Sequence, residues 1–494
     1  MFEIKVSQEI KDACPVFAGA AVYAAVKNTA YCEGLWKEID AFTAEDYFEV
    51  QADFGGYTGL WIDREEHTRI DREDAAQAIL AKTNGKPATI TKVEKEEKKT
   101  PPPLLYDLTE LQRECNRKFG FSAKKTLDIA QSLYEKRKMI TYPRTDSRYL
   151  SEDMKGKVKS TIRRLQALEE YAPYAEPLMQ EIRFTKRIID NAKVTDHHAI
   201  IPTDGKLRLE GLSEDEGKVF SLVAARFLAV FYPYYRYEVT KVYAEAEQER
   251  FLSKGTVVLE EGWQAVEKAL VPTATKKKKA KNEEEQKLPL LQEGEVRTIR
   301  SMELLRKRTK QPAPYTESSL LSAMENAGRF VEDEALKEQM KDSGLGTPAT
   351  RAAIIERLLT VGYLTRKGKN LLPTEKGRKL IEVVPQEMRS PQTTGKWEKG
   401  LSSIAKGKMT EERFMASIRR YVQFLIQDAA SRKTPQNKCL WEMPFLRTGY
   451  SGKLKILLLR RMEKRLQIFA LEGQPEAIRF RAGRRHGKAA AEKE

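Results

Sequence analysis

The stretch GLGTPATRAAIIERLLTVGYLTRKGKNLLPTEKGRKLIEVV, residues 344–384, carries the strongest fold signal in the chain. Thr347 and Pro348 form a typical helix start, because threonine caps free N–H groups and proline fits the first helical position. Gly362 ends this helix, since glycine readily takes the left-handed conformation of a C-cap. The spacing predicts a buried stripe made of Ile354, Ile355, Leu358 and Leu359.

A small β-hairpin is predicted directly after this helix. Residues 363–364 and 371–372 are expected to form short strands around the basic turn at 367–369, and another helix follows from Thr374. A helix, a two-stranded wing and a helix together make a winged-helix pattern.

The N-terminus of the Pro348 helix is a candidate phosphate-binding site. Its first N–H groups have no partner within the helix, and such groups attract anions. The Thr350 hydroxyl and the Arg351 guanidinium lie beside them in the sequence. Taken alone, this segment predicts a DNA-binding module similar to that of a transcription factor.

A second motif, ITYPRTDSRYL, occupies residues 140–150. Pro143 favours an extended Tyr142, and in an extended chain Arg144 shares its face. A phenol, with a pKa of about 10, is a weak nucleophile, but an adjacent guanidinium favours the phenolate and can hold a phosphate oxygen. Tyrosine and arginine side by side are what phosphotyrosine-forming chemistry requires. Taken alone, however, the motif fits better a Tyr-Pro turn whose ring packs on the core.

A third motif, TDHHAIIPT, covers residues 195–203. His198 could donate to a phosphate or simply cap the following segment. Relaxases and replication initiators also combine tyrosine with histidine, but their metal site needs two histidines separated by one residue. His197 and His198 are adjacent and would point to opposite faces of an extended chain, which argues against that class.

The remaining pattern predicts strands on both sides of a helical segment. Residues 47–63 alternate around Gly55-Gly56, as a β-hairpin does. Residues 104–168 are predicted to be helical with an interruption at Tyr142-Pro143, and strands return at 234–246 and 256–266. We therefore expect one sheet domain with a helical unit inserted in it, and helices again from Tyr315 onward.

Two low-complexity segments divide the chain. KVEKEEKKTPPP, residues 92–103, is charged and ends in polyproline, which predicts a linker. KKKKAKNEEEQK, residues 276–287, predicts a solvated loop, with contact to DNA as the alternative.

The composition indicates an anionic partner. The 494 residues include Lys+Arg 88 and Asp+Glu 72, a formal net charge of +16. Nucleic acid is the partner that such an excess favours, and a basic surface that only aids solubility is the alternative. The four cysteines are too far apart for a disulfide scaffold or a Cys-based zinc ribbon: Cys14, Cys32, Cys115 and Cys439.

The sequence predicts a cytoplasmic setting. No apolar run has the length of a membrane span. The apolar stretch at residues 15–26 follows Glu3, Glu9 and Asp12, where a secretion signal would carry positive charge.

Together these segments resemble the type IA DNA topoisomerases, most closely the bacterial topoisomerase III group. The resemblance extends from about residue 37 to about residue 431. The matching segments are ITYPRTDSRYL (140–150), HHAIIPT (197–203), RFLAVFYP (226–233), PYTESSLLSAMENAG (314–328), GLGTPATRAAIIERL (344–358) and TTGKWEKGLSSIAKGKM (393–409).

The resemblance implies a role for each candidate site residue. Tyr142 would be the nucleophile that opens a single strand and keeps a 5′-phosphotyrosine link. Arg144 and His198 would steady the scissile phosphate, while Thr350 and Arg351 would hold the neighbouring strand.

The resemblance also implies a multidomain α+β ring. A β-rich arch (gate) domain would carry an inserted helical, tyrosine-bearing domain and be followed by a helical, winged-helix-like DNA-binding domain. The expected parts are an unmatched segment (1–36), the first part of the arch (37–103), the tyrosine domain (104–231), the second part of the arch with the charged loop 276–287 (232–313), the winged-helix-like domain (314–432) and a basic tail (433–494).

The family begins with a Toprim domain, whose Glu and Asp-x-Asp carboxylates bind magnesium and assist proton transfer and resealing. Here the match starts beyond the place where that domain ends, and no Asp-x-Asp precedes it. Mg²⁺ is therefore implied as a cofactor, but its Toprim ligands are absent from these residues and no metal ligand is assigned. The unmatched ends suggest a fragmentary or frameshifted gene.

Two functions follow as hypotheses. The first is a bacterial, nucleoid-associated enzyme that cleaves, passes and reseals strands in single-stranded or underwound DNA. The second is an inactive DNA-binding fragment of such an enzyme. A separate Toprim-bearing polypeptide or a helicase would be a possible partner, and no membrane partner is expected.

Overall fold

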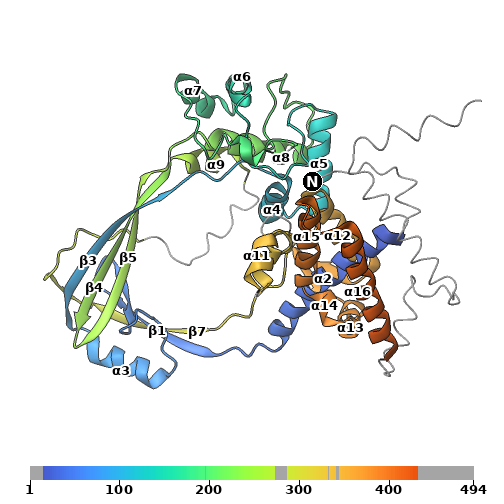
Figure 1. The fold of residues 1–494 in the computed structure, drawn as a ribbon. Helices are drawn as coiled ribbons and strands as arrows, with labels where there is room; N and C mark the ends of the chain where they lie inside the picture. Colours follow the sequence, from blue (N-terminus) through green and yellow to red (C-terminus); the bar gives the residue numbers. More distant parts are fainter. Residues whose placement is uncertain (1–14, 195, 273–285, 332, 341–343, 432–494) are drawn as a thin grey trace, which may run out of the picture.

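The structure is a computed structural model that describes residues 15–194, 196–272, 286–331, 333–340 and 344–431. Its fold is α+β, as predicted, with a large antiparallel sheet and two groups of helices. Figure 1 shows these three parts arranged around a ring, with the sheet at the left. We call the helices between residues 108 and 270 the upper helical group, and those at residues 15–40 and 317–431 the lower helical group.

The large sheet has seven strands in the order β6-β3-β4-β5-β2-β1-β7. The predicted hairpin is confirmed: β1 pairs with β2, with Gln51 opposite Leu60, and Gly55 and Gly56 form the turn at positive φ. Strands from both sides of the upper helical group join in this sheet. The strands are β1 (Asp46–Asp53), β2 (Thr58–Ile62), β3 (Pro87–Thr100), β4 (Tyr235–Ala246), β5 (Glu249–Glu260), β6 (Val296–Thr298) and β7 (Ser301–Arg308).

The linker predicted at residues 92–103 is wrong. Residues 92–100 belong to β3 and pair with β4 as far as Thr100 opposite Tyr235. This part of β3 is mostly exposed, so the backbone ladder holds it rather than apolar burial. Cross-strand charges support the pairing, because Arg236 Nε donates to Glu97 at 2.8 Å.

The second predicted β stretch is shifted in the structure. β5 already begins at Glu249 and ends at Glu260, and Trp263 starts helix α9. Gly262 allows this change of direction, since its φ of 48° is unfavourable for other residues. Of the charged block at 276–287, residues 276–285 lie outside the described part. Gln286 hydrogen-bonds the backbone of Thr58.

The upper helical group is built around α8. A capping box joins Ser213 and Glu216 at its start, and most of its side chains are buried. Phe220 and Phe227 lie at the centre of this core, and Ile140 from the tyrosine motif packs in it too. The helices are α4 (Leu108–Phe119), α5 (Ala123–Glu135), α6 (Met154–Gln166), α7 (Ala172–Gln180), α8 (Glu214–Ala229) and α9 (Trp263–Leu270).

The lower helical group contains the predicted helix–wing–helix pattern. Thr347 and Gly362 cap α12 as expected, β8 pairs with β9, and Thr374 caps α13. Ile355 and Leu358 are buried, and Ile354 and Leu359 are partly so. The elements are α2 (Pro15–Asp40), α10 (Glu317–Glu325), α11 (Glu334–Met340), α12 (Pro348–Val361), β8 (Leu364–Lys367), β9 (Asn370–Pro373), α13 (Glu375–Val383), α14 (Gln386–Arg389), α15 (Gln392–Ala405) and α16 (Glu411–Ser431).

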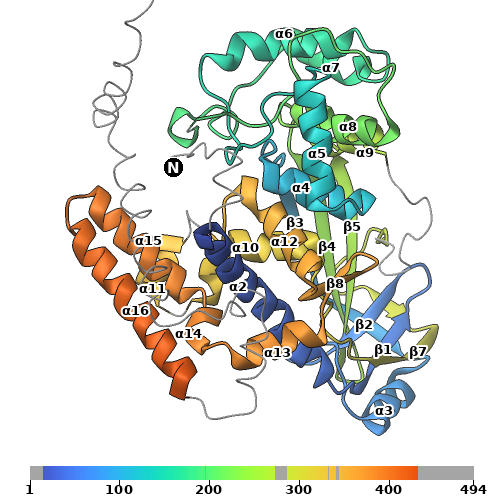
Figure 2. The same ribbon diagram turned by 90° about the vertical axis from the view of Figure 1, so that its right-hand side faces the viewer.

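The two helical groups meet where α4 and α5 lie above α10, α12 and the β8–β9 wing (Figure 2). This contact is rich in hydrogen bonds. The backbone N–H of Ala123 donates to the buried carboxylate of Glu317 at 2.6 Å, and Arg366 of the lower helical group holds the same carboxylate from its own side. Further bonds are Ser318 N to Asn116 Oδ1 (3.1 Å), Arg351 Nη1 to Thr109 Oγ1 (2.9 Å) and Lys369 Nζ to the Arg117 carbonyl (3.0 Å).

Within the described ranges, none of the helices combines the length and apolarity needed to cross a membrane.

Candidate active site

Tyr142 lies in a non-helical segment between α5 and α6. The preceding residue fixes this segment, because Thr141 N donates to the Ile201 carbonyl at 2.9 Å and Thr141 Oγ1 accepts from Ile201 N at 3.0 Å. On its other side, the Thr145 carbonyl accepts from Leu108 N at 3.1 Å. The tyrosine and histidine motifs, separated in the sequence, are therefore held side by side.

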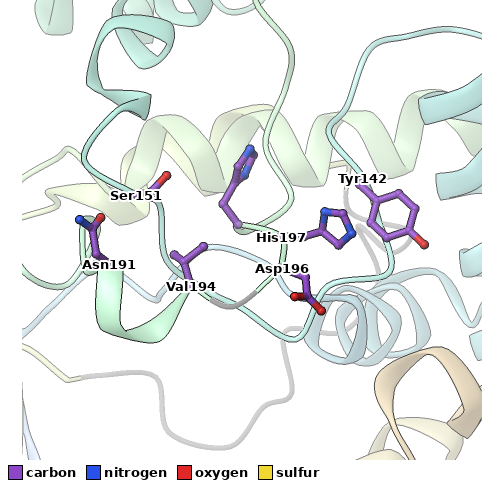
Figure 3. Close-up of a pocket in the computed structure, with 7 residues that line it drawn as sticks. Tyr142, Ser151, Asn191, Val194, Asp196 and His197 are labelled. Atoms are coloured by element: carbon purple, nitrogen blue, oxygen red, sulfur yellow. The ribbon is translucent and has the colours of Figure 1, made fainter. Parts of the chain in front are cut away.

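The Tyr142 side chain is half-buried at the edge of a cavity of about 380 Å³ (Figure 3). Its ring meets the Tyr134 ring edge-on, with 5.5 Å between centroids. Tyr134 in turn packs against the core of the upper helical group, so the Tyr142 ring lies between the rim of that core and the cavity. The cavity is lined by Tyr142, Ser151, Asn191, Val194, Asp196, His197 and His198.

His197 is the histidine that contacts Tyr142. The two ring centroids are 4.3 Å apart at an interplanar angle of 42°, and Figure 3 shows the rings side by side. Thr145 Oγ1 donates to the His197 carbonyl at 3.0 Å, which fixes the histidine relative to the tyrosine motif. The phosphate contact was predicted for the next residue, His198, and no signal in the sequence favoured His197 over it.

His198 is engaged elsewhere. Its Nδ1 lies 2.8 Å from the Ala199 carbonyl, which can only accept, so Nδ1 carries the hydrogen. Burial lowers the pKa of His198, and the charge of Lys157 acts in the same direction. In this arrangement the Nδ1 hydrogen of His198 is used within the protein. The phosphate contact expected of His198 stays a prediction.

Arg144 is half-buried next to the tyrosine. Its Nε is buried and has no hydrogen-bond partner among the described residues. An unpaired buried donor costs about 1–3 kcal/mol, so an anion that reached this nitrogen would recover that free energy. The geometry is compatible with the phosphate-holding role expected of Arg144.

The N-terminus of α12 differs in part from the expectation. Thr350 is exposed, and its Oγ1 accepts from Thr347 N at 2.9 Å in a capping box. Arg351 is buried, with Nη1 on Thr109 and a 3.6 Å ion pair to Glu325. Its guanidinium thus connects α12 to α4 and does not offer itself to DNA in this structure. Sequence could not show this, since Thr109 is 242 residues away.

The described residues do not provide a magnesium site. Over these ranges, no group of three or more His, Cys, Asp or Glu side chains is arranged to hold a metal ion. The aspartate that lines the cavity, Asp196, is exposed. The side chains present thus do not fit the cofactor that the resemblance implied.

Comparisons with known proteins give the family. The model of the DNA topoisomerase family matches residues 34–416. The chain is 40% identical over 396 residues to DNA topoisomerase 3 of Bacillus subtilis (strain 168), covering 79% of this chain and 54% of the relative. It is 41% identical over 400 residues to DNA topoisomerase 3 of Bacillus licheniformis, covering 80% and 54%. The chain thus spans about half the length of these curated relatives.

A solved structure supports the fold. Full-length topoisomerase I from Thermotoga maritima matches with a TM-score of 0.59 over 82% of this chain and 62% of that chain. The two sequences are 24% identical, so this likeness bears on the fold alone. With most of its length matched by the family model and by topoisomerase 3 sequences, the chain belongs to the type IA DNA topoisomerases and is topoisomerase 3-like.

Proposed function

We propose that this chain forms the tyrosine-bearing part of a topoisomerase 3 that cleaves one strand of single-stranded or underwound DNA, passes a strand and reseals the break. The observation that carries the proposal is Tyr142, held at the edge of a cavity against His197. A structural tyrosine would be expected in a closed core instead.

The proposed cleavage is a transfer of one phosphate ester to another. Tyr142 Oη forms a bond to the backbone phosphorus while the bond to the 3′ oxygen breaks, which leaves a 5′-phosphotyrosine. The phenol loses its proton and the departing 3′ oxygen gains one. Resealing is the same step in reverse, so no oxidant or second substrate is needed.

Two neighbouring side chains would stabilise the charge on the phosphate. Arg144 has a buried N–H without a partner among the described residues, and an oxyanion could accept from it. His197 is exposed, in contact with the Tyr142 ring, and placed to donate to the same phosphate. We assign this role to His197 in place of His198, whose N–H is used by the Ala199 carbonyl.

The proton for the 3′ oxygen needs a different group. The resemblance assigns it to Toprim carboxylates, and no Asp-x-Asp precedes the matched residues of this chain. Losing one general acid typically slows a reaction about 10²–10⁴-fold. The family uses Mg²⁺, but the described side chains form no site for a metal ion. We therefore assign Mg²⁺ no role in the cleavage step proposed for this chain.

The second candidate is a DNA-binding protein without cleavage activity. The net charge of +16 favours it, together with the lack of a metal-holding group in the described part of the chain. Under this proposal Tyr142 would be a remnant of the family's site, and binding to single-stranded DNA would be the whole function.

The deciding experiment measures relaxation and adduct formation with the purified 494-residue chain. We expect it to bind single-stranded DNA but not to relax supercoiled plasmid, with or without magnesium. Mixed with a separately made Toprim domain of a topoisomerase 3, it should form a covalent adduct with a single-stranded oligonucleotide.

The matched control is a second tyrosine of the same segment. Tyr142→Phe should abolish the adduct, whereas Tyr149→Phe should retain it, because Tyr149 is bonded to Lys193 and does not line the cavity. No adduct under any condition, with DNA binding intact, would favour the second candidate. Plasmid relaxation by the chain alone that Tyr142→Phe abolishes would show that the Toprim requirement is wrong.

A further inference from the structure

Helix α6 has an unusual charge distribution. Its 13 residues, Met154–Gln166, include five cations and no Asp or Glu. In α4 of the same helical group, by contrast, the cations pair with Glu110 and Glu114 on the same helix. The cations of α6 are Lys155, Lys157, Lys159, Arg163 and Arg164.

These charges oppose the formation of the helix. Lys155, Lys159 and Arg163 follow one another at a spacing of four, and each like-charged pair at that spacing costs about 0.2–0.5 kcal/mol. The first turn contains lysines, although the helix dipole favours negative charge there. The acidic residues at this end, Glu152 and the N-cap residue Asp153, precede the helix, and the Asp153 side chain makes no capping hydrogen bond. The residues that anchor α6 to the core are different ones, among them Val158 and Ile162. The fold of α6 therefore does not account for its cations.

Four of the cations are available to a ligand. Lys157, Lys159, Arg163 and Arg164 are all exposed, and in the described part of the chain none of them has an ion pair. Arg164 donates to the Asp204 carbonyl, which leaves its charge uncompensated. Lys155 is the exception, because it pairs with Glu152. We call the four exposed residues the α6 cationic face.

The α6 cationic face begins next to the candidate active site. Ser151 lines the cavity three residues before α6 starts, and Figure 3 shows it across the cavity from Tyr142. Glu152 N donates to the side chain of Asn191, which also lines the cavity. The charge of Lys157 contributes to the lowered pKa of His198, in keeping with a position near the cavity.

We propose that the α6 cationic face binds the phosphates of the strand that Tyr142 would cleave, where this strand leaves the cavity on the Ser151 side. The proposal rests on the proposed function and extends it by a second contact site for the same single-stranded nucleic acid. Within α6 there is no aromatic residue on which a base could stack. The binding is therefore to the backbone and independent of base sequence.

The test compares two variants of the full chain that lose the same charge. In the first, the four residues of the α6 cationic face are changed to Gln. In the control, four cations around α3 (Glu73–Thr83), at the far side of the ring, are changed to Gln: Arg69, Arg72, Lys82 and Lys86. Circular dichroism first verifies that both variants keep the helix content of the unmodified chain.

Binding to oligothymidine is then measured as a function of salt. The slope of log K against log salt is about −0.7 for each phosphate neutralised on a single strand. The magnitude of this slope should therefore fall by up to about 3 in the α6 variant, which loses four cations. The control should lose much less. The loss should be smaller for an oligomer of about 8 nucleotides than for one of about 30, because a short strand does not reach from the cavity along α6.

The outcomes separate this inference from the proposed function. An unchanged slope in the α6 variant, with steep salt dependence in the unmodified chain, overturns the α6 site and leaves the proposed function intact. An equal loss in both variants also overturns it, since net charge alone would then explain binding. If the unmodified chain does not bind single-stranded DNA, the proposed function itself fails. Binding of α6 to anionic vesicles in place of DNA would assign the face to a different partner and refute the proposal.

Discussion

Arg351→Met tests whether the buried arginine of α12 is structural. The substitution removes the 2.9 Å bond to Thr109 Oγ1 and the 3.6 Å ion pair to Glu325 while keeping most of the apolar stem. Thr109 is fully buried, so its hydroxyl loses a charged partner that water does not replace.

The expected loss follows from these contacts. A hydrogen bond to a charged group contributes about 1.5–3 kcal/mol to the free energy of unfolding. Glu325 remains about one-third exposed and is rehydrated, so its ion pair adds only about 0.5 kcal/mol. Methionine fills much of the space of the arginine stem, so the substitution leaves little empty volume and adds little further loss of stability. We expect a total loss of about 3 kcal/mol.

The assay is urea unfolding followed by circular dichroism, with Arg357→Met as the control. Arg357 is an exposed arginine on the same helix, and its replacement should change the unfolding free energy by less than about 0.5 kcal/mol. The salt dependence of single-stranded DNA binding should be the same in both variants. If Arg351→Met keeps full stability and instead lowers the salt slope by about 0.7, the residue contacts a phosphate and our reasoning is wrong.

Three other substitutions have defined expectations. Tyr142→Phe should change the melting temperature by no more than a degree or two in a thermal scan, equivalent to about 0.5 kcal/mol; a large fall would mean that the hydroxyl is structural. Thr145→Val removes the hydroxyl that donates to the His197 carbonyl, so urea unfolding should show a loss of about 1–3 kcal/mol in stability, and the yield of covalent adduct should fall. The control Thr141→Ser retains its hydroxyl and should keep both the stability and the adduct yield. Burial raises the pKa of Asp107 to about 7, so its contribution to stability is complete below about pH 4 and is lost as the pH rises to about 7. Asp107→Asn keeps the oxygen that accepts from Glu110 N. At pH 8 this variant should be more stable to urea than the unmodified chain, by at most about 4 kcal/mol, and the two should converge only below about pH 4. A difference that stays constant with pH would contradict the shift.

Local signals predicted the winged part of the fold well. Thr347, Pro348 and Gly362 determine the ends of α12 through interactions with their own neighbours, and these rules need no knowledge of the rest of the chain. The hairpin around Gly55-Gly56 was equally local. Residues 92–100 were mistaken for a linker because a solvated strand has no apolar periodicity, and its partner is more than 130 residues further along the chain.

The candidate site was predictable in its composition but less so in its geometry. The sequence motifs indicated two segments, around Tyr142 and His197, and the structure brings these segments together. Which histidine faces the tyrosine depends on the bond from Thr145 to the His197 carbonyl and on the bond from His198 to the Ala199 carbonyl. Neither bond leaves a pattern in the sequence. The burial of Arg351 depends in the same way on a distant partner, Thr109.

The hydrogen-bonded contact between the two helical groups has a thermal consequence. Separating α10 and α12 from α4 and α5 would expose polar groups such as Glu317, Asn116 and Thr109, with Ala123 as a small apolar contribution. Exposed polar surface lowers the heat capacity by about 0.26 cal/mol/K per Å², and apolar surface raises it by about 0.45. The two contributions have opposite signs, so the heat-capacity change of separation would be smaller than for an apolar contact of the same area. The free energy of separation would then change with temperature with less curvature. Ionic strength would also affect the free energy of separation, because the Lys369 and Arg351 contacts across this surface depend on charge.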